Sequence, residues 1–525
     1  MKLCRRPLGA LIALIALIAL RPSDAGACGG CFHEPSQTES TVVTGHRMAF
    51  AVSPARTILW DQIEYSGAPS SFAWVLPVKS GAEIELSTDA WFEALDAATT
   101  VQVVSPPADC AGPTSGGGCS LGCSASENAL YDRGAGNRPD VTVVHQGTVG
   151  PYETVTLHAN VPGALPDWLT SHGFAIDAGV QPVIDAYAAE GFDFIALRLL
   201  PGQGVQQMKP VRVVTPGGSP TLPLRMVAAG TGAKVGITLF VVGEGRWEAQ
   251  NFPNGQVSAG DVVWDFATQK SSYATLRAAL LASGGGRTWS TSYAKAGALL
   301  RGVSDGQGNP TPYTVAGFSA QTIAEAYVRQ GLENGESTDA SCLGALGQLA
   351  DATSVVSGAC LGEAGGGGGA GGAGTGGMGA GGGAGTGGVG AGGGAPGCVV
   401  GADEIDARTL ACGPLDDVAA ALAGMHPRDV WITRLEADLP RAALASDLAL
   451  KAGAQAEVDN WISVTKSVNS PCAAAAAASI GPSARWVDIR RENQLALAAS
   501  VLLAVAAALG RRRRRRPAYV PATAR

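Results

Sequence analysis

The stretch RMAFAVSPARTILWDQIEYSGAPSSFAWVLPV, residues 47–78, contains the pattern that decides the fold. Its three segments RMAFAVSP, TILWDQIEY and SFAWVLPV are apolar runs or alternate apolar with polar residues, and Ser, Gly and Pro stand between them. Short segments of this kind, bounded by turn residues, are typical of β-strands. The ordered part of the chain therefore begins with a predicted run of strands.

The same strand pattern recurs between residues 101 and 245 and again between residues 428 and 466. Further strands are predicted at 101–107, 140–149, 151–159, 192–200, 211–216, 222–230, 235–245, 428–440 and 459–466. Helical spacing predicts a helix that Ser87 caps, with Asp89 in its first turn and Trp91, Phe92 and Leu95 on its inner face. Other helices are predicted at 165–173, 181–191, 272–286, 320–331 and 442–453. We expect an α+β fold, dominated by antiparallel sheets with a few helices on one side.

The two ends of the chain predict export and anchoring. Lys2, Arg5 and Arg6 precede an apolar core and the small residues Ala25-Gly26-Ala27, which is the pattern of a secretory signal peptide over residues 1–27. A retained anchor, or a lipid on Cys28, is the alternative. At the other end, the uncharged helix predicted over 494–510 stands directly before six arginines, and basic residues resist translocation. We expect a C-terminal transmembrane helix, a basic cytoplasmic tail at 511–525 and a body outside the cytoplasm, in the cell envelope.

Charge supports an exported body. The chain has a net charge of −7, and the basic ends leave residues 28–510 at −17. Such a body repels phosphate backbones, so nucleic acid is excluded as its partner. The membrane, reached through the C-terminal helix, and an unknown cell-surface or envelope partner are the partners that we expect.

Ten cysteines remain after removal of the signal peptide, an even number that indicates disulfides in an oxidising compartment. The disulfide candidates are Cys28, Cys31, Cys110, Cys119, Cys123, Cys342, Cys360, Cys398, Cys412 and Cys472. The segment ACGGCFH does not match the haem motif C-x-x-C-H, because Phe32 separates Cys31 from His33. A zinc site that includes Cys119 and Cys123, or a redox pair of Cys28 and Cys31, is the alternative to disulfides.

A glycine tract divides the body. Twenty-two of the 33 residues in 365–397 are Gly, so this segment cannot bury a core and is predicted to be a disordered linker or inserted loop. The expected organisation is a signal peptide at 1–27, an exported disulfide-containing domain at 28–364, the tract at 365–397, a continuation of the domain at 398–490, the helix at 494–510 and the tail at 511–525. Seven mature cysteines precede the tract and three follow it, so complete pairing requires a disulfide across it.

Several of these segments together resemble one bacterial family. They are ACGGCF after the signal, FAWVLPV before DAWFEALD, GFDFIALRLLPG before MKPVRVVTPG, and LPLRMVAAGTGA. As a set they are similar to domain of unknown function 2330, from Cys28 to about residue 350, and MHPRDVWITRLEADLP resembles that family resumed after the tract. The resemblance implies an exported domain and supplies no catalytic residues. The C-terminal helix and arginines resemble the sorting tails of myxobacterial surface proteins, although the cysteine usual before such helices is missing here.

Catalytic patterns are weak in this sequence. Residues 302–306 match G-x-S-x-G, but a turn-rich loop follows where a nucleophile elbow requires a helix. His145 and His158 lie in neighbouring predicted strands without metal-ligand spacing, and Asp89, Glu93 and Asp96 are predicted on the exposed face of a helix. Trp60, Trp74 and Trp91 are predicted core residues. We therefore predict no catalytic, cofactor-binding or metal-binding residues and no cofactor.

We expect a membrane-anchored cell-surface protein that serves as a binding or structural module, not as an enzyme. An exported hydrolase whose site the sequence does not reveal is the alternative, and a redox protein that uses Cys28 and Cys31 is a further one. A deep pocket with convergent titratable groups would favour the hydrolase. Flat exposed aromatic patches would favour the binding module.

The first testable prediction concerns the mature N-terminus. Because the small-residue site ends at Ala27, N-terminal sequencing of the exported protein should begin at Cys28. A sequence that begins upstream and retains Leu8 to Leu20 would contradict removal of the signal peptide.

Overall fold

The computed structural model describes residues 31–32, 42–66, 73–108, 145–158, 163–174, 176, 179–200, 208–228, 231–301, 313–315, 318–320, 322–340, 342–343, 346–361 and 399–470. The predicted signal peptide, the G-x-S-x-G segment, the glycine tract, the C-terminal helix and the basic tail lie outside these residues. Within them, none of the helices combines the length and the apolar character that a membrane crossing requires.

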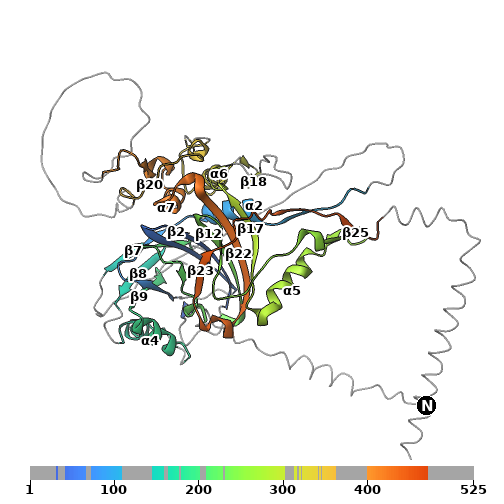
Figure 1. Cartoon of the computed structure of the whole chain (residues 1–525). Coiled ribbons are helices and arrows are strands. Elements are labelled where there is room, and N and C mark those ends of the chain that lie inside the picture. Colours follow the sequence, from blue (N-terminus) through green and yellow to red (C-terminus); the bar gives the residue numbers. More distant parts are fainter. Residues whose placement is uncertain are drawn as a thin grey trace, which may run out of the picture.

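Two large sheets form the centre of the molecule (Figure 1). The larger sheet has the strand order β14 (Asn254–Gly255), β17 (Trp289–Ala296), β22 (Val430–Pro440), β12 (Thr231–Glu244), β2 (Val42–Val52), β3 (Arg56–Ser66), β10 (Val211–Pro216) and β5 (Glu83–Leu86). The smaller sheet has the order β1 (Cys31–Phe32), β4 (Ala73–Lys79), β9 (Phe192–Leu199), β8 (Tyr152–Leu157) and β7 (His145–Val149). Short strands make up the remaining sheets: β11 (Thr221–Leu222), β23 (Leu448–Ala452) and β13 (Trp247–Ala249); β16 (Lys270–Ser271), β15 (Val263–Asp265) and β25 (Lys466–Val468); β18 (Tyr313–Val315) and β19 (Phe318–Ala320); β20 (Val356–Ser357) and β21 (Ile405–Asp406); β24 (Trp461–Ser463) and β6 (Gln102–Val104).

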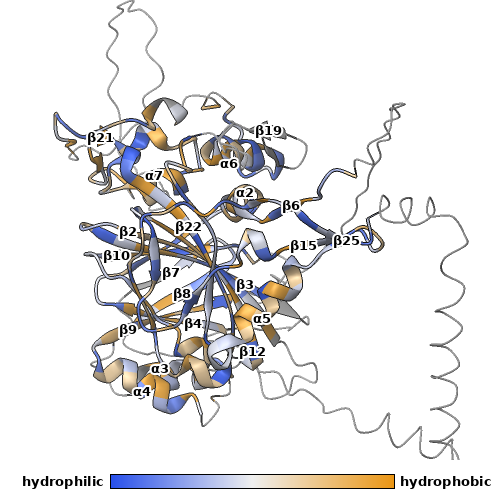
Figure 2. Ribbon diagram, turned by 45° about the vertical axis from the view of Figure 1, so that its right-hand side comes forward, coloured by the Kyte–Doolittle hydropathy of each residue, from blue (hydrophilic) through white to orange (hydrophobic). Residues whose placement is uncertain are grey.

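Helices cover the outer faces of both sheets, so the body has four layers (Figures 1 and 2). The α-helices are α2 (Asp89–Thr99), α3 (Ala164–Ser171), α4 (Gln181–Ala189), α5 (Tyr273–Gly286), α6 (Ile323–Glu333) and α7 (Asp417–Leu422). The short 3₁₀ helices are η2 (Met226–Ala228), η3 (Ala259–Asp261), η4 (Leu346–Leu349), η5 (Ala407–Leu410), η6 (Pro427–Asp429) and η7 (Arg441–Ala445). Helices α2, α6 and α7 share a core with the larger sheet, and α3 and α4 share one with the smaller sheet. A third core fills the space between the two sheets.

These findings confirm a strand-rich α+β fold with antiparallel sheets. Every pairing in the smaller sheet is antiparallel. The expectation of helices on one side was wrong, because each sheet has one face against the other sheet and must cover its opposite face separately. The centre of the larger sheet is also not antiparallel, since β12 pairs parallel with β2.

The chain beyond the glycine tract supplies an interior strand of the larger sheet. Strand β22 pairs antiparallel with β12 along its whole length, from Lys234 opposite Pro440 to Glu244 opposite Val430. Its other edge pairs with β17. The residues on the two sides of the tract thus belong to one sheet and share hydrophobic cores.

A disulfide also joins the two sides of the tract. Cys342 and Cys412 are bonded, with Cα atoms 5.8 Å apart and a sequence separation of 70 residues. Cys360 is disulfide-bonded as well, and Cys31 lies in β1 opposite Trp74. The other cysteines named above lie outside the described residues. The chain-entropy model assigns roughly 3–5 kcal/mol to a cross-link that closes a loop of this size.

Two local predictions were wrong for the same reason. Residues 442–453 are rich in Ala and Leu and were predicted to be helical, but they form η7 and then strand β23. Leu448 and Leu450 are buried in alternation because β23 pairs with β11 and β13. Residues 222–230, predicted as a strand, contribute only the end of β11 and the 3₁₀ helix η2. In both segments tertiary packing overrides local propensity.

The start of α2 also differs from the prediction. Thr88, not Ser87, occupies the N-cap position, and its side chain makes no capping hydrogen bond. The carboxylate of Glu336 accepts hydrogen bonds from the backbone N–H groups of Asp89 and Ala90 instead, at 2.9 and 3.1 Å. A residue distant in sequence therefore accepts hydrogen bonds from first-turn amides that have no partner within the helix. The inner face is confirmed, because Trp91, Phe92 and Leu95 are fully buried.

The second testable prediction follows from the disulfide across the tract. A site-specific protease sequence placed within residues 365–397 should allow cleavage into two pieces that remain linked in denaturant, because Cys342 and Cys412 lie on opposite sides. Non-reducing electrophoresis should show one band, and addition of a reductant should give two. Two bands without a reductant would contradict the bond.

Candidate functional site

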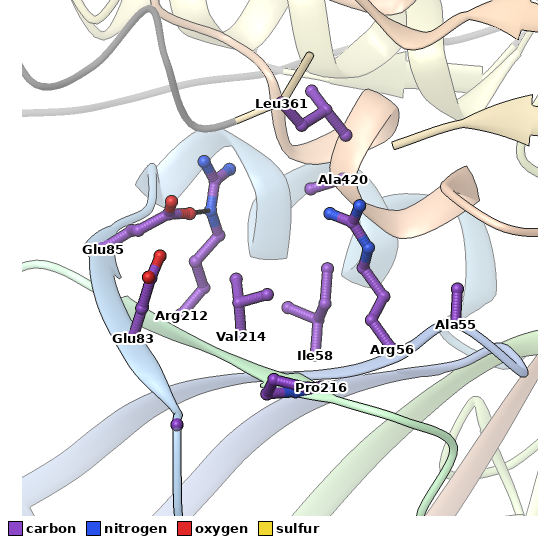
Figure 3. Close-up of a pocket in the computed structure, with 11 residues that line it drawn as sticks. Ala55, Arg56, Ile58, Glu83, Glu85, Arg212, Val214, Pro216, Leu361 and Ala420 are labelled. Carbon is purple, nitrogen blue, oxygen red and sulfur yellow. Dashed lines mark hydrogen bonds and ion pairs between the residues drawn. The ribbon is translucent and has the colours of Figure 1, made fainter. Parts of the chain in front are cut away.

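A cavity of about 290 Å³ opens at the edge of the larger sheet, under α7 (Figure 3). Strands β3, β10 and β5 form its floor. Leu361, the last described residue before the tract, and Ala420 of α7 lie above it. Segments from both sides of the tract thus build this pocket.

Strand register arranges the floor of the pocket in rows. Trp60, Arg212 and Glu85 lie side by side on the three strands, and Ile58, Val214 and Glu83 form the next row. Arg56 and Pro216 form the third row. Alternate residues of a strand point to the same face, so all these side chains point toward α7. Figure 3 shows Arg56 and Arg212 on opposite sides of Ile58 and Val214.

Arg212 is buried and fully paired with carboxylates. Its Nε donates to Glu85 at 2.5 Å, and its two terminal nitrogens donate to Asp416 at 2.6 Å each. Nη1 also lies 3.0 Å from Asp417. Burial alone would lower the pKa of this guanidinium, but the three carboxylates raise that pKa well above its usual value. Arg212 is therefore a structural cation whose donors are already used.

Asp417 is the centre of the polar network beneath α7. It is 0% exposed. Five side chains donate hydrogen bonds to its carboxylate: Trp60 at 2.7 Å, Ser87 at 3.0 Å, Thr88 at 3.0 Å, Tyr327 at 2.6 Å and Arg212 at 3.0 Å. Burial and the adjacent carboxylate raise the pKa of Tyr327 well above its usual value, so its hydroxyl stays protonated and donates. A buried carboxylate with this many donors has its hydrogen-bonding capacity filled. Removal of the carboxylate, or of one of its donors, leaves buried polar groups without a partner.

Arg56 differs from Arg212, because among the described residues no carboxylate lies within ion-pair distance of it. Its side chain donates to the backbone carbonyl of Gly358 at 2.9 Å. Burial lowers the pKa of the Arg56 guanidinium, Glu85 raises it and the nearby Arg212 lowers it again. An arginine keeps its proton under such conditions. The pocket therefore contains a half-buried cation whose charge is not matched by a direct partner.

The carboxylates that were predicted on the exposed face of α2 are half-buried or paired. Each one ties the helix to a neighbouring element and so has a structural role. Their partners are Lys209 for Asp89, Asn334 for Glu93, and Arg47 and Arg434 for Asp96. The three tryptophans Trp60, Trp74 and Trp91 are buried, which confirms their prediction as core residues.

The histidines whose side chains the structure describes have separate partners. His145 faces Thr156 across the β7–β8 hairpin, while His158 lies beyond the end of β8, 3.0 Å from Asp193. A different pair escaped the sequence analysis: His46 Nδ1 lies 3.0 Å from Asp61 Oδ1. Both residues are 2% exposed, so this pair is buried. Strand register places Ile63 opposite His46 and Met48 opposite Asp61, so the two side chains are diagonal neighbours on β2 and β3.

The pocket contains two charged side chains that have no ion-pair partner among the described residues. Its charged groups come from rigid strands, and Glu85 is held by Arg212. In the part of the chain that the structure describes, no group of three or more His, Cys, Asp or Glu side chains could hold a metal ion. Arg56 and the exposed Glu83 remain as charges that a bound molecule could pair with.

The third testable prediction concerns the Asp417 network. Substitution Asp417→Ala would leave Trp60, Tyr327 and Arg212 as buried donors without their acceptor, so the free energy of unfolding should fall by roughly 3–5 kcal/mol. Urea unfolding followed by tryptophan fluorescence measures this change. The control Asp438→Ala removes an exposed pair with Lys234 and should cost about 0–1 kcal/mol. Equal effects of the two substitutions would refute a central role for Asp417.

Comparison with known proteins gives one result at the level of the family. Neither the curated proteins nor the solved structures include a match to this chain. The model of a family described as an uncharacterized protein conserved in bacteria, DUF2330, matches residues 22–301, slightly more than half of the 525 residues. The match ends before the glycine tract, so resumption of the family pattern at Met425 stays a prediction. It includes β3, β5 and β10, the floor of the pocket, and the chain belongs to the DUF2330 family.

Proposed function

We propose that this protein is exported, is anchored in a membrane by its C-terminal helix, and displays its body at the cell surface as a ligand-binding module. The observation that carries the binding role is the pocket under α7, in which Arg56 has no carboxylate partner among the described residues. A guanidinium in such a position gains a favourable interaction when an anionic group of a ligand enters.

Export is supported by three properties of the chain. The N-terminal pattern is that of a signal peptide. The Cys342–Cys412 disulfide is of the kind that persists in oxidising compartments. The acidic body is suited to an aqueous exterior and not to contact with anionic lipids. Anchoring rests on the apolar segment and the arginines that follow it.

Recognition through a flat aromatic surface has little support. The large apolar side chains that are exposed in the described residues are Leu86, Val104, Val399 and Val468, and none of them is aromatic. A pocket is therefore the better candidate for ligand contact than a surface patch.

The convergence of Glu83 and Glu85 in the pocket is the one observation that favours an exported hydrolase instead. Two residues apart on one strand, they lie on the same face, at a spacing of ~6.6 Å between Cα atoms. Glu85 is engaged by Arg212, and Glu83 is exposed to water. The general acid of a hydrolase is usually desolvated and not engaged by a cation. Neither the paired Glu85 nor the exposed Glu83 meets both conditions. We therefore place binding before hydrolysis.

The fourth testable prediction concerns topology. An Ala524→Cys variant should resist a membrane-impermeant thiol reagent applied to intact cells, because the arginines keep the tail in the cytoplasm. The control Ala442→Cys, at an exposed body position, should be labelled. Labelling of both positions would contradict the topology. Replacement of Arg511 to Arg516 by Ser should weaken retention in the membrane, as measured by release of the protein into the medium.

A further inference from the structure

Two charges without ion-pair partners face the pocket from different strands. Arg56 on β3 donates only to a backbone carbonyl with its guanidinium, and Glu83 on β5 makes no ion pair within the described residues. Both residues line the cavity. The other two charged lining residues, Arg212 and Glu85, are already paired with each other, and Arg212 also pairs with Asp416 and Asp417 outside the lining. The pocket thus offers one cation and one anion to an incoming molecule.

Strand register gives the separation of these two charges. Glu83 pairs with Val214, which pairs with Ile58, and Arg56 is two residues from Ile58 on the same strand. Two inter-strand steps of ~4.8 Å and one two-residue step of ~6.6 Å place the Cα atoms of Arg56 and Glu83 ~12 Å apart. Both side chains rise from the floor on the side that faces α7 (Figure 3). A dipeptide, in which successive Cα atoms are ~3.8 Å apart, spans part of this Cα separation, and the side chains of Arg56 and Glu83 span the rest.

The surface between the two charges is apolar. Ile58 and Val214 form it, and Leu361 lies opposite. A cavity of about 290 Å³ accommodates a small molecule and not a folded partner. A plain anion would meet Arg56 but also approach Glu83, Glu85 and the nearby Asp416, so a phosphate or dicarboxylate is disfavoured by charge repulsion. A ligand with both charges avoids that repulsion.

We propose that this pocket is a binding site for small zwitterions of dipeptide size. The ligand's carboxylate pairs with Arg56, its ammonium group pairs with Glu83, and an apolar side chain lies on Ile58 and Val214. This inference rests on the proposed binding function and specifies its ligand class.

Gly358 provides a way to move Arg56 without a change of charge. A Cβ atom added to Gly358 would lie 1.7 Å from Arg56 Nη2 and 2.5 Å from Cζ. Because the clash is with the flexible end of a side chain, the guanidinium moves and the backbone does not need to. Gly358→Ala should therefore retain the fold while it displaces the cation from its position in the pocket.

The test is a binding measurement on the purified full-length chain. Three probes are used. Glycyl-leucine carries both charges, N-acetyl-glycyl-leucine carries only the carboxylate, and glycyl-leucinamide carries only the ammonium group. Isothermal titration calorimetry should give a Kd for glycyl-leucine at least tenfold lower than for either blocked probe. NMR signals of the Ile58 and Val214 methyl groups should shift on its addition.

The variants assign the binding to the two charges. Arg56→Gln, Glu83→Gln and Gly358→Ala should each weaken glycyl-leucine binding at least tenfold, while Arg428→Gln, a control at an exposed arginine paired with Asp429, should not. Equal binding by a blocked probe, or by Arg56→Gln, would overturn the zwitterion site and leave the binding role intact. No response to any probe at the two methyl groups would overturn both the site and the proposed binding role.

Discussion

The carboxylate of Asp417 holds together segments that are far apart in the sequence. Its five donors come from β3, the start of α2, β10 and α6, and Asp417 itself begins α7. An unpaired charge at a fully buried position would cost several kcal/mol, so the network is stable only when all of these elements are in place. We therefore expect the docking of α7 on the larger sheet to be an all-or-none event. Asp417 shares the donors of Arg212 with Glu85 and Asp416, which leaves Arg56 as the cation available in the pocket.

The position of the glycine tract follows from this arrangement. The described residues before the tract end at Leu361, which lines the pocket, and those after it include α7 and β22. Strand β22 lies in the interior of the larger sheet, so the residues after the tract are necessary for the sheet to be continuous. A long insertion is tolerated between such segments because the entropy of loop closure grows only with the logarithm of loop length. The Cys342–Cys412 disulfide limits the separation of the two ends in the unfolded chain.

Local patterns in the sequence predicted much of the fold. Alternation and turn residues placed β2, β3, β4 and β9, helical spacing placed the buried face of α2, and cysteine parity predicted a bond across the tract. Long-range pairing was not predictable in this way. The parallel contact of β12 with β2 joins residues 188 to 191 positions apart, and residues 448–452 become a strand only because β11 and β13 flank them. The pocket was also missed, since Arg56 and Glu83 look like surface charges until strand register places both on one face of the sheet.

Native-state hydrogen exchange on the full-length chain tests the central claim, that Asp417 couples the segment after the tract to the sheet before it. Exchange is followed by mass spectrometry at increasing urea concentrations. It gives the free energies of opening for peptides that cover α7 (Asp417–Leu422) and β3 (Arg56–Ser66). We expect the two peptides to open with the same free energy, and Asp417→Asn to lower both values together. Opening of α7 at a much lower free energy, with β3 unchanged in the variant, would show that α7 docks independently and would contradict this account.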